Sequence, residues 1–150
     1  MIVFLRRFLV FQALLAWQGG FFFYAAVVVP IGTDLLGSAK EQGFITQRVT
    51  HWLNLLAVVY LALAAWDQRY SRGRTRWFVW LAQLLVLAAL VPLHAHLDTF
   101  MDAESGRLAR GNFYPAHAIY LWLSAAHWFL GLAAAALMLA AWTRPPEPSA

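Results

Sequence analysis

The chain has 150 residues, of which 62% are hydrophobic and only 12% are charged, and it includes eight tryptophans and eleven phenylalanines. This composition is typical of an integral membrane protein and gives no support for a nucleic-acid-binding role. The chain contains no cysteine, which excludes disulfides, thiolate metal sites and cysteine nucleophiles.

Four mostly apolar segments are each long enough to cross a bilayer as a helix, for which about 18 residues suffice. They run roughly over residues 8–31, 45–66, 77–97 and 116–142. The first continues through FFFYAAVVVP without the small-residue cleavage site of a signal peptide, so we expect it to be retained. The predicted fold is therefore all-α, an integral membrane four-helix bundle over residues 1–143, followed by a disordered cytoplasmic tail over residues 144–150.

Residues that break helices mark the expected ends of these four helices. Pro30 with Gly32 is expected to end the first helix, and the SRGRT run separates the second from the third. Asn112 with Pro115 is expected to introduce the fourth. The segments between the helices are too short to contain a soluble domain.

The basic residues indicate the orientation of the bundle. Cytoplasmic loops of membrane proteins carry an excess of Lys and Arg. In a four-span arrangement one side has Arg6, Arg7, Arg69, Arg72, Arg74, Arg76 and Arg144, and the other has Lys40, Arg48, Arg107 and Arg110. We therefore expect a multi-pass protein of an inner (cytoplasmic) membrane of bacterial type, with both termini in the cytoplasm and the lipid bilayer as its first partner.

The second and fourth helices contain similar stretches, HWLNLLAVVYLALAAW from His51 and HWFLGLAAAALMLAAW from His127. Both begin with His-Trp and end with Trp, at Trp66 and Trp142. A weaker similarity links VVPIGTDL, after the first helix, to LVPLHAHLDTF, after the third. The bundle is thus interpreted as two repeated two-helix units, with a coincidence of Ala-rich and Leu-rich helices as the alternative.

This spacing predicts a layer of histidines. With Trp66 and Trp142 at the inner interface, a rise of about 1.5 Å per residue puts His51 and His127 roughly 22 Å above them, and His94 reaches a similar depth. Polar side chains in membrane helices tend to face the bundle, because unpaired polar groups are costly in lipid. Inward stripes on the second, third and fourth helices would bring these three rings together. The stripe of the second helix is Gln47, His51, Asn54 and Val58, that of the third is Gln83, Leu87, Leu90, His94 and Asp98, and that of the fourth is His117, Tyr120, Ser124, His127, Gly131 and Ala134.

Two interpretations of the layer remain open. In the first, His51 and His127, with His94 as a third ligand, bind haem b or a copper or zinc ion, because neutral imidazole is a common ligand of all three. In the second, no cofactor is bound and each ring forms a hydrogen bond between helices. The residues expected around the site are Asn54, Tyr120, Ser124, Asp98 and Gln18, with His96 and His117 at its periphery.

The first third of the chain also carries a family resemblance. Its matching residues are Trp17, Gly19, Gly20, Phe22, Val29 and Pro30, which form a Trp-x-Gly-Gly element, an aromatic run and a Val-Pro pair. This stretch resembles the small four-helix membrane family called domain of unknown function 4149 and is more distantly similar to the copper-resistance D permeases. The first resemblance implies an inner-membrane protein without assigned chemistry, and the second implies copper handling on the periplasmic side.

The sequence thus predicts an inner-membrane protein that binds haem b or a copper-type ion in the outer half of the bilayer, for redox chemistry or metal handling. The alternative is a structural accessory subunit, packed against other membrane subunits or against copies of itself. An enzymatic role is not predicted, because the chain shows no motif for hydrolysis or nucleotide chemistry.

Overall fold

The computed structural model describes residues 1–70, 73–102, 107–108 and 113–143, so the predicted tail and Asn112 lie outside the described residues. In chain order the helices are α1 (Ile2–Phe23), the π-helical turn η1 (Tyr24–Val28), α2 (Val29–Leu36), α3 (Ala39–Gln68), α4 (Arg74–Asp98) and α5 (Phe113–Thr143). Between α4 and α5 the two-residue strands β1 (Met101–Asp102) and β2 (Arg107–Leu108) pair antiparallel.

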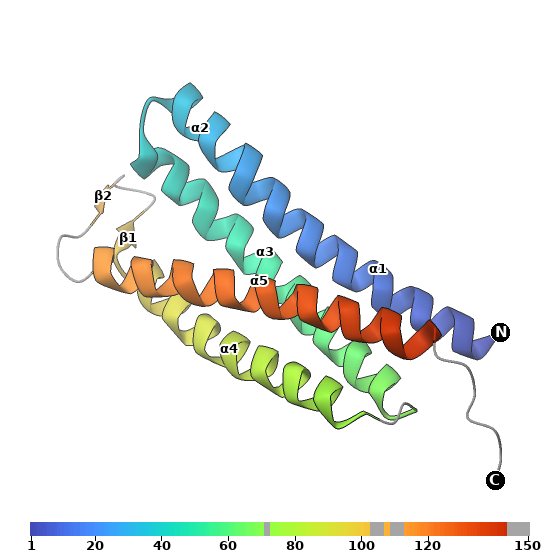
Figure 1. The fold of residues 1–150 in the computed structure, drawn as a ribbon. Helices are drawn as coiled ribbons and strands as arrows, with labels where there is room; N and C mark the ends of the chain where they lie inside the picture. Colours follow the sequence, from blue (N-terminus) through green and yellow to red (C-terminus); the bar gives the residue numbers. More distant parts are fainter. Residues whose placement is uncertain (71–72, 103–106, 109–112, 144–150) are drawn as a thin grey trace, which may run out of the picture.

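The predicted all-α four-helix bundle is confirmed. Elements α1, η1 and α2 form one continuous helix, and with α3, α4 and α5 they give four helices that are long and apolar enough to cross a membrane. Figure 1 shows them side by side, with the N-terminus and the last turn of α5 at the same end. Large apolar side chains such as Phe22, Trp122 and Phe129 are exposed on the outer surface, as expected for contact with lipid.

The prediction that Pro30 and Gly32 end the first helix is wrong. The helix continues to Leu36 and ends at Gly37, whose φ of 64° is left-handed. Pro30 has no N–H to give to the preceding turn of this continuous helix, and the π-helical turn η1 directly before it accommodates the missing bond. Just before it, the Val29 amide donates to the Tyr24 carbonyl five residues back, which is the spacing of a π turn.

The bundle consists of two helix pairs. Helix α3 packs along α1, and α5 packs along α4. One apolar cluster joins all four helices, through residues that include Leu14 of α1, Ala57 of α3, Leu87 of α4 and Met138 of α5. A second cluster, formed by Leu90, Leu97 and Tyr120, belongs to α4 and α5 alone.

The inward faces agree with prediction on α4 and α5 but not on α3. On α5 the buried residues include Tyr120, Ser124 and His127, and on α4 they include Gln83 and Leu87. On α3 the predicted stripe is wrong at His51 and Val58, which are exposed, whereas Gln47 and Asn54 are partly buried. The fully buried residues of this part of α3 are Thr50, Leu53, Ala57 and Tyr60. The buried face is displaced by one residue, which corresponds to about 100° around the helix.

This displacement separates the two similar stretches. His51 is exposed whereas His127 is buried, and Tyr60 is buried whereas its counterpart Ala136 is exposed. Equivalent positions of the proposed repeat therefore do not share an environment.

Candidate functional site

An open cleft of about 260 Å³ lies between α3 and α4 at the end of the bundle near β1. We call this end the cleft end. The lining brings together two predicted ligands, His51 and His94, with the predicted neighbour Asp98. The complete lining is Gln47, Arg48, His51, His94, Asp98 and Met101. Two imidazoles, a carboxylate and a thioether therefore face one open space.

Both ring nitrogens of His94 already have partners. Its Nε2 lies 3.1 Å from the Gln47 carbonyl oxygen on α3, and its Nδ1 lies 3.4 Å from Asp98 Oδ2, one turn further along α4. Both partners are acceptors, and a neutral imidazole carries a single N–H, so it donates to one of them at a time. His94 is thus held as an interhelical contact, and it would have to turn away from one acceptor to bind a ligand through nitrogen.

His51 stands at the rim of the cleft. Its side chain is exposed, and its ring meets the edge of its neighbour Trp52, at 6.1 Å between centroids. The exposure explains why the polar pattern misplaced the buried face of α3. A polar side chain near the end of a membrane helix reaches water without facing the bundle.

His127 lies elsewhere. It is 2% exposed, its ring is 4.5 Å from that of Trp17, and its Nε2 has no hydrogen-bond partner within the described protein. It lines a cavity of about 10 Å³, roughly the room that one water molecule needs. The polar residues in that lining are Thr50, Asn54, Tyr120, Ser124 and His127.

The three predicted ligands therefore do not converge: His51 and His94 share the cleft, whereas His127 lines the interior cavity. In the described part of the chain, no group of three or more His, Cys, Asp or Glu side chains is placed to hold a metal ion. The peripheral histidines lie apart from both spaces, His96 exposed beside Phe100 and His117 stacked on Phe113.

Three of the five residues predicted around the site connect helices: Asn54, Tyr120 and Gln18. Asn54 Nδ2 on α3 donates to the Tyr120 hydroxyl on α5 at 3.3 Å. Gln18 on α1 donates from Nε2 to the Trp128 carbonyl at 2.9 Å, and the Trp128 indole donates back to the Gln18 carbonyl at 3.3 Å. Neither contact involves the cleft, so these side chains hold the bundle together rather than surround a ligand.

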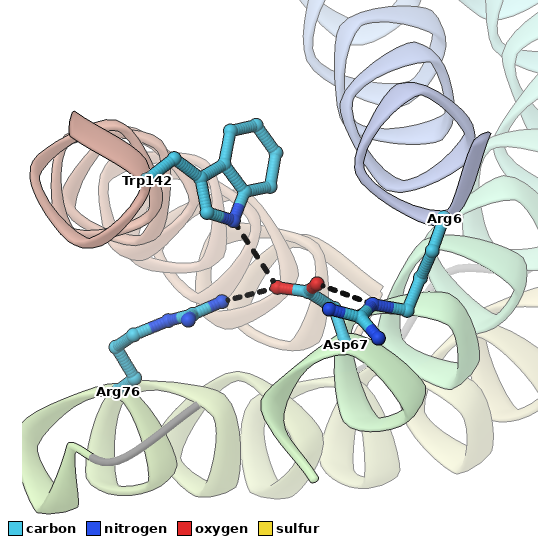
Figure 2. A network of polar contacts seen from close by, with 4 residues as sticks. All are labelled: Arg6, Asp67, Arg76 and Trp142. Atoms are coloured by element: carbon cyan, nitrogen blue, oxygen red, sulfur yellow. Dashed lines mark hydrogen bonds and ion pairs between the residues drawn. The ribbon is translucent and has the colours of Figure 1, made fainter. Parts of the chain in front are cut away.

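A polar network at the opposite end was missed by sequence reasoning. Figure 2 shows Asp67 of α3 accepting from Arg6 Nε at 2.9 Å and from Arg76 at 2.8 Å. The Trp142 indole donates to the same carboxylate at 3.4 Å. Asp67 is 1% exposed, and its three partners come from α1, α4 and α5, so one carboxylate joins all four helices.

A sequence signal for this network existed. Asp67 stands at the end of an apolar helix, next to a tryptophan, and the flanking segments carry arginines. A carboxylate in that position needs a cation, because a charge left unpaired in or near lipid is expensive. The membrane topology alone accounts for the excess of arginine at this end, so it does not indicate that two of these arginines pair with Asp67.

Comparisons with known proteins give no further guide to this site. No family model, no curated protein and no solved structure matches the chain. The resemblance of the first third to the unknown-function family and to the copper-resistance D permeases therefore stays a prediction.

Proposed function

We propose that this membrane protein binds a single copper or zinc ion in the cleft between α3 and α4. The observation that carries the proposal is the shared lining, because His51, His94, Asp98 and Met101 face one space. Imidazole and carboxylate suit zinc and divalent copper, and a thioether adds a soft ligand for copper. The role that follows is metal handling at the cleft end, and the excess of Lys and Arg at the opposite end supports an outer location for it.

Haem is the weaker choice of cofactor. Ligation by two histidines needs rings that face one another across a common space. His51 and His127 line different spaces, and the smaller of these measures about 10 Å³. An ion at the cleft needs its ligands to be drawn together, because the described side chains are not yet grouped around one point.

Binding has a structural requirement at His94. The ring must free one nitrogen from the Gln47 carbonyl or from Asp98. Arg48 also lines the cleft, and its positive charge opposes a cation there, but its side chain is exposed and long enough to move into water. The Asp98 carboxylate offsets that charge when an ion is bound.

The test is a metal titration of purified protein in mild detergent, after treatment with a chelator. We expect one equivalent of copper or zinc to bind to the wild type, and His51→Ala and His94→Ala each to weaken binding by tenfold or more. His96→Ala is the matched control, because it removes an exposed imidazole two residues from His94 and outside the cleft lining. Failure to bind a stoichiometric ion, or an equal loss in the control, would reject the site.

The second candidate function is a structural accessory subunit whose histidines are interhelical contacts. Its supporting observation is the His94 contact with the Gln47 backbone. Such hydrogen bonds contribute about 0.6 to 2 kcal/mol each. A metal-free protein in which His94→Leu lowers the free energy of unfolding by that amount would favour this role. The size of the protein purified in mild detergent would then distinguish a homo-oligomer from a complex with other subunits.

A further inference from the structure

Positive charge is in excess at the end of the bundle opposite the cleft. We call residues 1–8, 66–70, 73–78 and 139–143 the arginine end. Within these residues Asp67 is the only carboxylate, whereas the arginines number five: Arg6, Arg7, Arg69, Arg74 and Arg76. Asp67 is already shared by two of them, so the described residues of this end contain no further carboxylate for the others.

Arg7 is the residue for which this excess matters most. Its side chain is half-buried, and its guanidinium lies 5.5 Å from the centre of the Trp142 ring. Its Nε is buried and finds no hydrogen-bond partner in the described protein. A buried donor without an acceptor costs free energy, so the arrangement favours an acceptor beyond the described residues.

The surroundings of Arg7 are those of a lipid headgroup site. Phe4 and Phe8 stack on one another beside it on α1, and both are exposed. Phe11 meets the edge of Trp142, which links this apolar surface to α5. A cation next to exposed aromatic rings at the end of a membrane helix matches a phosphate with acyl chains below it.

We infer that Arg7, held against Trp142, binds the phosphate of one anionic phospholipid at the arginine end. The guanidinium supplies paired N–H donors to phosphate oxygens, a geometry that suits arginine better than lysine. Arg6 and Arg76 stay on Asp67 and do not take part. The site does not depend on a metal in the cleft.

Native mass spectrometry in mild detergent tests this inference. The wild type is titrated with phosphatidylglycerol and, separately, with phosphatidylcholine. We expect one phosphatidylglycerol to bind more tightly than the rest, and Arg7→Gln to weaken it about tenfold. Arg74→Gln is the matched control, because it removes the same charge from an exposed side chain at the same end, and we expect less than a twofold change.

Three outcomes would overturn the inference. Equal losses in Arg7→Gln and Arg74→Gln would mean diffuse attraction by the whole basic end. Equal affinity for phosphatidylcholine would exclude selection by charge. Full displacement of the lipid by millimolar inorganic phosphate would show that the acyl chains contribute nothing and that free phosphate is the ligand. If Arg7→Gln does not fold, Arg7→Lys serves instead: we expect binding to fall several-fold, and wild-type binding would refute the role of the guanidinium.

Discussion

Replacing Asp67 with asparagine should destabilise the whole bundle, because this one carboxylate is shared by Arg6 and Arg76. A hydrogen bond to a charged group contributes about 1.5 to 3 kcal/mol, so the two together contribute about 3 to 6 kcal/mol. Asparagine keeps one oxygen and hence part of one bond. The two arginine side chains are only 9% and 6% exposed, so water does little to replace the lost charge. We expect a loss of about 3 kcal/mol in the free energy of unfolding, as for other broken buried ion pairs.

The assay is equilibrium unfolding in mild detergent, followed by tryptophan fluorescence and circular dichroism. Arg69→Gln is the control, because Arg69 is exposed at the same end, and it should change stability by less than about 0.5 kcal/mol. Arg76→Gln should fall between the two, because Asp67 keeps Arg6 as a partner. A loss below about 1 kcal/mol in Asp67→Asn would show that the arginines reach water unaided, and the account of this end would then be incorrect.

Two further predictions concern the interior of the bundle. A methyl group on Gly131 would overlap the Gln18 amide nitrogen and lie 2.7 Å from Trp17 Cζ3. Gly131→Ala should therefore lower the free energy of unfolding by about 1 to 3 kcal/mol, measured by thermal unfolding. Gly19→Ala, with no atom within 4 Å of the added carbon, should be neutral or stabilising, and equal effects would contradict this view of the packing. His127→Phe removes a buried unpaired nitrogen and should change stability by less than about 1 kcal/mol without altering metal binding; a loss above 2 kcal/mol would reveal a polar role for this ring.

Much of the fold was predictable from apolar length and from periodicity where helices are enclosed. The inward stripe on α5, from Tyr120 through His127, followed from the spacing of polar residues because that part of the helix has neighbours on its polar side. The same argument failed on α3, where His51 stands at a cleft near the end of the helix. There a polar side chain has an alternative to the interior, so polarity no longer indicates the buried face.

The candidate site was predictable only in part, for a related reason. The depth of a side chain along a helix follows from counting residues. Whether side chains of different helices converge depends on how each helix is rotated about its axis, and the one-residue displacement of the buried face of α3 separates His51 from His127. Met101 could not be assigned to the cleft, since it lies beyond the end of α4 in a segment without helical periodicity. The Asp67 network was within reach of charge arguments, because its members are charged residues at helix ends.

The unequal attachment of the two helix pairs has a mechanical consequence. At the arginine end a shared carboxylate fixes α1 and α3 to α4 and α5. Toward the cleft end the pairs are joined by neutral contacts, such as that between Asn54 and Tyr120, and by His94 against a backbone carbonyl. The two helix pairs are therefore held most firmly to each other at the arginine end. A small rotation of one pair about that end produces its largest displacement at the cleft. The width of the cleft is accordingly the dimension that this architecture leaves most free to vary.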